Sequence, residues 1–226
     1  MSLTAACAEV ATVVFDLDNT LVNRQRAFAR WAVAAARRWR PDWRKPQRKE
    51  FCRAAVACDD WGAADRLEMA AALAGLLDAD RTPQQMWHDF RGEIARHVRT
   101  DRSVLALLER LRRRGFKLAV ASNGSLANQQ AKLTAGGLDE IDWELTAISG
   151  EWDAAKPSPR FYELIRRRLG VPARQLLMVG DDALRDVAAA HAAGWRTCWV
   201  SWGRAIPDVR ADFVVEHLTQ LEQVLP

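Results

Sequence analysis

The first two predicted strands are separated by about a hundred residues, and this spacing constrains the fold more than any other feature of the sequence. Residues 11–15, ATVVF, form an apolar, β-branched run that ends at Asp16 and is typical of a buried strand. The next comparable run is KLAVA at 117–121. A crossover between parallel strands takes about 30 residues, and its loops take only a few. The sequence therefore predicts an insertion between the first two strands.

This insertion is predicted to be helical and to span residues 22–100. It is rich in Ala, Arg, Leu and Trp and contains no convincing strand. Thr82 followed by Pro83 is typical of an N-cap and the first position of a helix. Helices are expected over 25–39, 47–58, 63–77 and 82–98. We expect residues 22–100 to form a helical cap domain, and residues 1–21 with 101–226 to form the core domain.

Beyond residue 100, strands and helices alternate regularly. Strands are expected over 117–121, 144–149, 175–179, 196–200 and 213–215. Gly115, Gly170 and Gly194 close predicted helices, since glycine readily takes the left-handed position after a helix. A further helix is expected over 183–193. The alternation predicts an α/β fold with a doubly wound, mainly parallel, Rossmann-like sheet and the helical cap inserted into it. In such a fold the ligand lies beyond the carboxyl ends of the strands.

Polar side chains follow three of these strands at that expected position. In an extended segment, alternate residues point to the same side, so Asp16 and Asp18 share one side of the chain. The polar residues at the three strand ends are Asp16, Asp18, Ser122, Asn123, Asp181, Asp182 and Asp186. Lys156 lies in the loop before a predicted helix over 159–169. We expect them to converge in one crevice, which would include one or both of Asp182 and Asp186.

The charges in this crevice indicate a metal ion. Four or five carboxylates would face one evident cation, Lys156. Like charges in contact raise one another's pKa unless a divalent ion compensates them. Oxygen ligands with room for water are suited to Mg²⁺. A site of this kind, with a lysine and a hydroxyl nearby, is suited to a phosphate and to Mg²⁺-dependent phosphoryl transfer.

Four motifs in this order resemble those of the haloacid dehalogenase-like (HAD) hydrolases. They are FDLDNTL, ASNGS, AKPSPRFYE and VGDDALRD. The helical insertion after the first motif resembles the family's subgroup with a helical (C1-type) cap. The resemblance covers the core, whereas the cap is similar only in position and helical character.

The resemblance implies a role for each site residue. Asp16 would be the nucleophile that forms an aspartyl-phosphate, and Asp18 the general acid and then the general base. Mg²⁺ would be held by Asp16, the backbone carbonyl of Asp18, and Asp181, with Asp186 supporting it through water. For Asp182, two interpretations stay open: it is the N-cap of the following helix, or it supports the metal ion.

The phosphate would be held by the remaining polar residues. The resemblance implies that Ser122 and the amide nitrogens near Asn123 bind phosphate oxygens. Lys156 would offset the charge of both the phosphate and the nucleophile, and Thr20 would brace the loop.

The leading hypothesis is a Mg²⁺-dependent phosphatase for a small phosphate monoester. The alternatives are a phosphomutase or phosphotransferase, a 2-haloacid dehalogenase of the same superfamily, and a non-catalytic phosphate-binding or nucleic-acid-binding module. The resemblance argues against the dehalogenase, because that branch uses no metal and lacks the second aspartate, which is present here as Asp18.

The small excess of positive charge, +4, lies on the insertion, which has 16 basic and 10 acidic residues. Segment 37–49 is its densest part and includes Trp39 and Trp43. It is either an electropositive lid for an anionic substrate or a solvated segment whose Trp side chains pack inward; the second interpretation is favoured.

We expect a small phosphorylated metabolite as the partner, no nucleic acid, and a monomer or homodimer. No apolar run approaches the ~18 residues of a membrane span, and the N-terminus lacks the pattern of a signal peptide. The expected location is the cytoplasm.

Overall fold

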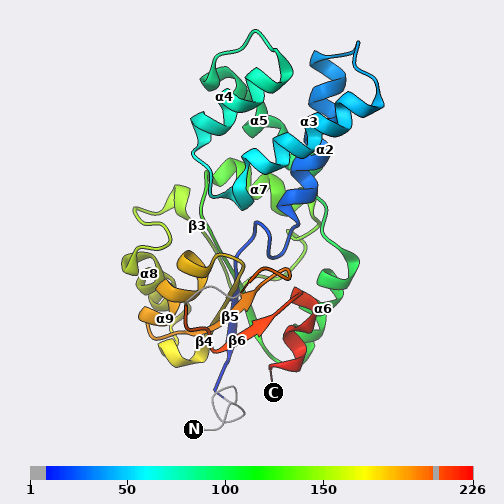
Figure 1. Cartoon of the computed structure of the whole chain (residues 1–226). Coiled ribbons are helices and arrows are strands. Elements are labelled where there is room, and N and C mark those ends of the chain that lie inside the picture. Colours follow the sequence, from blue (N-terminus) through cyan, green and yellow to red (C-terminus); the bar gives the residue numbers. More distant parts are fainter. Residues whose placement is uncertain (1–8, 206–208, 226) are drawn as a thin grey trace. The chain divides into compact units, whose positions relative to one another are not determined.

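A six-stranded parallel sheet forms the centre of the core in the computed structural model, which describes residues 9–205 and 209–225 (Figure 1). Every pair of neighbouring strands is parallel, in the order β3-β2-β1-β4-β5-β6. The strands are β1 (Thr12–Phe15), β2 (Lys117–Ser122), β3 (Leu145–Ile148), β4 (Leu176–Gly180), β5 (Arg196–Val200) and β6 (Phe213–Val215). The predicted α/β fold with a doubly wound parallel sheet is confirmed.

Strand β1 lies at the point where the strand order reverses. It pairs with β2 on one side and β4 on the other, and all four of its residues are buried. Phe15 is level with Val120 of β2 and Val179 of β4. The residues that follow these three strands therefore emerge side by side, where open α/β sheets hold their ligands.

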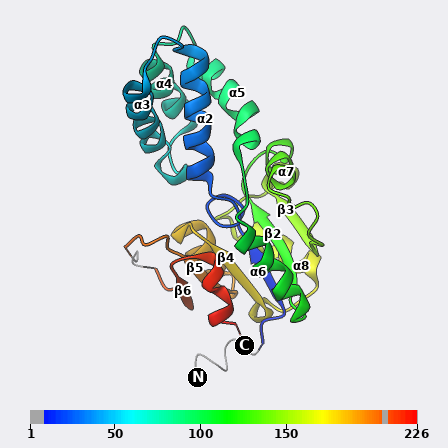
Figure 2. The same cartoon turned by 90° about the vertical axis from the view of Figure 1, so that its right-hand side faces the viewer.

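Helices cover both faces of the sheet (Figures 1 and 2). On one face, α8 (Pro159–Leu169) and α9 (Ala189–Ala192) pack on alternate residues of the strands, with Phe161, Tyr162 and Trp195 as the largest side chains of that cluster. Helix α6 (Arg102–Arg113) and the 3-10 helix Leu218–Gln223 lie on the other face, joined by an ion pair between Arg110 and Glu222 at 2.7 Å. Helix α7 (Leu126–Ala135) joins β2 to β3. The sheet is thus enclosed, and its carboxyl edge carries the polar residues.

The predicted glycine positions at helix ends are confirmed, with φ of 89° at Gly115, 69° at Gly170 and 80° at Gly194. The predicted helix over 183–193 differs in form. It is a π-helix over Ala183–Ala188, followed by the short α9. The wider turn accompanies a buried Asp186, whose carboxylate accepts hydrogen bonds at the sheet edge. Such wide turns are frequent at functional sites.

The contacts divide the chain into two units, residues 1–22 with 100–226 and residues 23–99. The second unit is helical and consists of α2 (Arg24–Trp39), α3 (Lys45–Cys58), α4 (Arg66–Leu77), α5 (Pro83–Glu93) and the 3-10 helix Ile94–His97. The predicted cap of α5 is confirmed, because Thr82 and Gln85 bond to each other's backbone N–H groups. Pro83 takes the first helical position.

Aromatic rings fill the centre of the helical unit. Phe28, Trp31 and Phe90 contact one another with ring centroids 4.9 to 5.5 Å apart. The two Trp residues of the basic segment also pack on aromatic partners: Trp39 lies 6.4 Å from Trp31, and Trp43 lies 5.8 Å from Phe51. These contacts favour the interpretation in which the Trp side chains pack inward. Across the described parts of the chain, we find no helix that combines the length and the apolar character needed to cross a membrane.

Helix α4 offers a matched test of this helical unit. Leu73 is fully buried, whereas Leu76 on the same helix is 38% exposed. Replacing a buried Leu by Ala removes packing and leaves a cavity, which costs about 2–5 kcal/mol. We expect Leu73→Ala to lower the free energy of unfolding by that amount in urea denaturation, and Leu76→Ala to lower it by less than about 1 kcal/mol. Equal losses in the two variants would contradict this packing.

Candidate active site

The ammonium group of Lys156 joins two carboxylates at the carboxyl edge of the sheet. Its Nζ lies 2.6 Å from Oδ1 of Asp16, directly after β1, and 2.6 Å from Oδ1 of Asp186 in the π-helix. The lysine side chain is only 3% exposed. A buried ammonium group requires such partners, because an unpaired charge in the interior is very unfavourable. The sequence prediction that Lys156 faces Asp16 therefore agrees with the geometry.

Asn123 fixes the backbone that carries Lys156. The Asn123 side-chain amide donates to the carbonyl oxygen of Lys156 at 2.7 Å, and the Lys156 backbone N–H donates to Oδ1 of Asn123 at 2.9 Å. The Asn123 side chain, which follows β2, is thus occupied in orienting the loop between β3 and α8. The amide nitrogens expected to bind phosphate are therefore those of the backbone near Asn123.

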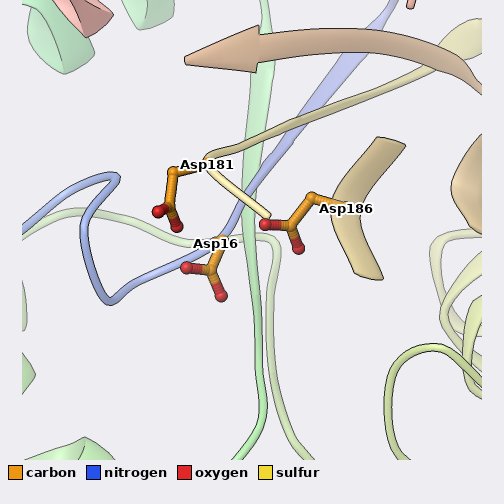
Figure 3. A group of neighbouring side chains, drawn as sticks. All are labelled: Asp16, Asp181 and Asp186. Atoms are coloured by element: carbon orange, nitrogen blue, oxygen red, sulfur yellow. The ribbon is translucent and has the colours of Figure 1, made fainter. Parts of the chain in front are cut away.

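Three aspartates share one small space at this edge (Figure 3). Carboxylate oxygens of Asp16, Asp181 and Asp186 all lie within 4.8 Å of one another, and all three residues are buried. They come from separate segments, after β1, after β4 and from the π-helix. The convergence expected from the sequence is therefore present for these three residues.

Burial and mutual repulsion favour the neutral forms of these carboxyl groups. Burial raises the pKa of Asp16 to about 7, with the charges of Asp186 and Asp18 adding to it and Lys156 opposing it. Burial, with the charges of Asp16 and Asp186, raises the pKa of Asp181 well above its usual value. The pKa of Asp186 is raised by burial as well, against the opposing charge of Lys156. Burial acts to lower the pKa of Lys156, but the two carboxylates outweigh it and raise that pKa. A further cation would relieve this repulsion.

The backbone carbonyl of Asp181 is held by two side chains from the β5 region. The indole N–H of Trp199 donates to it at 2.9 Å, and a guanidinium N–H of Arg204 donates at 2.7 Å. Arg204 also contacts Oδ2 of Asp181 at 3.1 Å. These donors fix the orientation of the segment that places Asp181 beside Asp16.

The two acidic residues after Asp181 have different environments. Asp182 is the N-cap of the π-helix, because its Oδ1 accepts from the backbone N–H groups of Leu184 and Arg185. Asp186 is 1% exposed and belongs to the buried cluster. Gly180 makes room for it, since a Cβ at that position would overlap the Asp186 carboxylate. Of the two residues, Asp186 therefore lies in the buried cluster, whereas Asp182 caps the π-helix.

Asp18 lies beside this cluster and is held from helix α7. Its Oδ2 accepts from Lys132 at 2.5 Å and from the Gln129 amide at 3.2 Å. The same Gln129 amide nitrogen donates at 2.6 Å to the hydroxyl oxygen of Ser122, the last residue of β2. Ser122 keeps its own hydroxyl hydrogen for another acceptor.

The loop after Asp18 turns sharply and buries its polar residues. Asn19 takes a positive φ of 59°, and its carbonyl oxygen accepts from the Trp202 indole at 2.6 Å. Thr20 is 2% exposed, and its hydroxyl has no hydrogen-bond partner among the described residues. The structure therefore places Thr20 inside the loop that carries Asp16 and Asp18.

The expected charge balance of the site needs a correction. The sequence suggested one cation, Lys156, but Lys132 contacts Asp18 and Arg204 contacts Asp181 as well. Three cationic side chains thus stand against four carboxylates. Sequence reasoning missed the two additional cations, together with Gln129. The sequence contained one indication that Gln129 and Lys132 could act together: they are three residues apart and therefore share a helix face.

The chain belongs to the haloacid dehalogenase-like hydrolase family, whose profile matches residues 10–194. Phosphoserine phosphatase from Thermus thermophilus is 39% identical over 111 residues, which are 46% of this chain and 44% of that protein. (S)-2-haloacid dehalogenase 2 from a Pseudomonas species is 33% identical over 132 residues, 57% of each chain. The chain thus spans about half the length of these curated relatives.

A solved structure supports the fold over nearly the whole chain. The HAD hydrolase YfnB from Bacillus subtilis superposes with a TM-score of 0.75 at 18% identity, covering 96% of this chain and 99% of that one. The chain is therefore a hydrolase of this family, with relatives named both as phosphatases and as dehalogenases.

The raised pKa values predict how the stability of the metal-free protein depends on pH. Because the pKa of Asp16 is raised to about 7, this carboxyl group binds more protons in the folded state than in the unfolded state between about pH 4 and pH 7. The stabilisation of the folded state by protonated Asp16 is fully present below the ordinary pKa of Asp and is lost as the pH rises through 7. In excess chelator, we expect the melting temperature to fall from pH 5 to pH 8, and to fall less in Asp16→Asn.

The exposed Asp139→Asn provides the matched control for this measurement, since it removes a carboxylate outside the cluster. It should leave the pH dependence as in the wild type. Identical pH dependence in the wild type and in Asp16→Asn would contradict the raised pKa.

Proposed function

We propose that the protein is a Mg²⁺-dependent phosphatase that hydrolyses a small phosphate monoester through an aspartyl-phosphate on Asp16. The observation that carries this proposal is the meeting of three buried carboxylates, from Asp16, Asp181 and Asp186, within 4.8 Å. Asp18 lies beside them and can serve as the acid and base. Nucleophile, proton carrier and cation site are then combined at one edge of the sheet.

The donor set of the cluster fits Mg²⁺. The carboxylates of Asp16, Asp181 and Asp186 are hard oxygen ligands, and burial together with the charges of neighbouring carboxylates raises their pKa values. Asp16, Asp181 and the backbone carbonyl of Asp18 would hold the ion, with Asp186 supporting it. A bound Mg²⁺ would neutralise phosphate charge and orient the phosphoryl group. YfnB, which shares the fold, is described as bound to magnesium.

The first step is an attack by the Asp16 carboxylate on phosphorus. A nucleophilic carboxylate must be ionised, whereas the pKa of Asp16 in the metal-free protein is about 7. Lys156, at 2.6 Å, favours the ionised form. The ester P–O bond breaks as the Asp16–phosphorus bond forms, and Asp18 gives its proton to the departing alcohol oxygen.

The second step regenerates the enzyme. Asp18 removes a proton from water, whose oxygen attacks the phosphorus of the aspartyl-phosphate, and the Asp16–phosphorus bond breaks. Inorganic phosphate leaves with Asp16 again ionised. The same residue thus acts as acid in the first step and as base in the second.

Phosphate oxygens would be held by groups around the cluster. The Ser122 hydroxyl accepts from Gln129 and can donate its own hydrogen to a phosphate oxygen. Lys156 and the backbone amides near Asn123 complete the expected set, and Thr20 braces the loop of the nucleophile. These fixed donors would stabilise the charge that develops on the transferring phosphoryl group.

We assign residues 22–100 as a cap domain that selects the substrate, following the family resemblance. The substrate class is a small phosphorylated metabolite. Phosphoserine phosphatase, which is 39% identical over 111 residues, is named for a substrate of that class. Nucleic acid is not expected as a partner.

A 2-haloacid dehalogenase is the second candidate, since a relative with that name is 33% identical over 132 residues. The shared nucleophile would then attack a carbon atom and release halide. Asp18 argues against this candidate, because the family resemblance implies that dehalogenases lack this second aspartate. The two functions differ in product and in their need for a metal.

A panel of phosphate monoesters assayed with Mg²⁺ and with excess chelator tests the proposal. We expect turnover with Mg²⁺ only, and a loss on the order of 10³-fold or more in Asp16→Asn, because the nucleophile is removed. Asp18→Asn should lose about 10²–10⁴-fold with esters of poor leaving groups. Asp182→Asn is the matched control, since Asn also caps a helix and Asp182 lies outside the cluster.

Turnover that survives Asp16→Asn would refute the assignment of the nucleophile. Full activity in chelator would refute the metal requirement. Release of halide from a 2-haloacid, without activity on any phosphate ester, would establish the second candidate instead.

A further inference from the structure

We propose that Lys132 and Gln129 are positioning residues that hold Asp18 in the orientation needed to activate water in the second step. This inference rests on the proposed function, in which Asp18 is the acid and base. Neither residue belongs to the four motifs, and both come from helix α7. They act through Asp18 and are not expected to contact the phosphate themselves.

The two side chains form a buried clamp on one oxygen of Asp18. Lys132 Nζ lies 2.5 Å from Oδ2 and the Gln129 amide nitrogen lies 3.2 Å from the same atom. Lys132 is 3% exposed and Gln129 is 1% exposed. Lysine is almost never buried to this extent unless it is paired, and Asp18 provides such a partner for Lys132. The clamp is therefore part of the site and not an incidental surface contact.

Gln129 also connects Asp18 to the phosphate-binding side of the site. Its amide nitrogen donates to Ser122 at 2.6 Å as well as to Asp18, so both of its N–H groups are used. Asp18, after β1, and Ser122, at the end of β2, are thereby held at a fixed distance from each other. Gly124 allows this approach, because a Cβ there would lie 3.1 Å from the Gln129 side chain and because its φ is 146°.

The consequence of the clamp is kinetic. In the second step, Asp18 takes a proton from water while the water oxygen bonds to phosphorus and the Asp16–phosphorus bond breaks. Loss of the Lys132 or Gln129 donor loosens the hold on Oδ2 of Asp18, so a smaller fraction of the phosphorylated enzyme has its base in place. Formation of the aspartyl-phosphate from an ester with a good leaving group needs no proton from Asp18, and it should proceed almost unchanged.

The charged groups around Asp18 are compatible with this role. Lys132 faces Asp18 from α7, and the Asp18 charge contributes to the raised pKa of Asp16 on the preceding strand end. The nucleophile Asp16 is paired with Lys156, which also binds Asp186. Lys132 and Lys156 thus serve different carboxylates, and removal of Lys132 leaves the pairing of the nucleophile intact.

The test compares Lys132→Met and Gln129→Met with the wild type on p-nitrophenyl phosphate, in saturating Mg²⁺. Each Met keeps the length of the side chain and removes the donor. We expect kcat to fall about tenfold or more, because general base catalysis contributes about 10²–10⁴-fold. The value of kcat/KM should stay within about threefold, and a rapid release of nitrophenolate should precede the slow steady state. Lys117→Met is the matched control, since Lys117 is exposed and paired with Glu144.

Asp18→Asn in the same assay separates the possible failures. Suppose that Asp18→Asn shows the rapid first release of nitrophenolate, but that both Met variants leave kcat and kcat/KM unchanged or lower them together. That result would overturn the positioning role and leave the proposed function standing. Activity that does not depend on Asp16 and Asp18 would overturn both. If Lys132→Met fails to fold, Gln129→Met decides the question, because it removes a neutral donor from the same oxygen.

Discussion

The ion pairs of Lys156 with Asp16 and Asp186 are the interaction on which the site depends. The ammonium group bonds at 2.6 Å to a carboxylate after the central strand and to another in the π-helix, and it thereby joins two distant parts of the chain. Asn123 holds the backbone of this lysine from a third segment. Strand β1 can accept these partners because it is flanked by β2 and β4, whose ends deliver Asn123 and Asp181 to the same edge.

The crowding of buried carboxyl groups gives the site its chemistry. Three cationic side chains face four carboxylates, and yet burial and repulsion still raise the pKa values of Asp16, Asp181 and Asp186. In the metal-free protein, the protonated forms of these carboxyl groups are therefore favoured. A doubly charged ion and the phosphate that it attracts would complete the balance, and would also keep the nucleophile ionised. Family membership alone leaves open the choice between a phosphatase and a dehalogenase, and this acidic cluster is the observation on which we base the proposal of a phosphatase.

The sequence predicted the parts of the site that lie at strand ends. Asp16, Ser122 and Asp181 each follow a recognisable apolar run, and parallel strands must bring their carboxyl ends to one edge. Lys132, Gln129 and Arg204 were missed because they reach the site as long side chains from a helix and a loop, and their direction depends on packing. The choice between Asp182 and Asp186 was open for the same reason: it depends on the π-helix, whose wider turn has no simple sequence pattern.

Calorimetric titration of the metal-free protein with Mg²⁺ at pH 7 tests the central claim most directly. If Asp16, Asp181 and Asp186 share one ion, a single Mg²⁺ should bind per chain and displace protons, because the pKa of Asp16 is about 7 before binding. The measured heat should then differ between buffers of different ionisation enthalpy, and Asp181→Asn should weaken the binding. Absence of binding, or a heat that is the same in every buffer and unaffected by Asp181→Asn, would contradict the account.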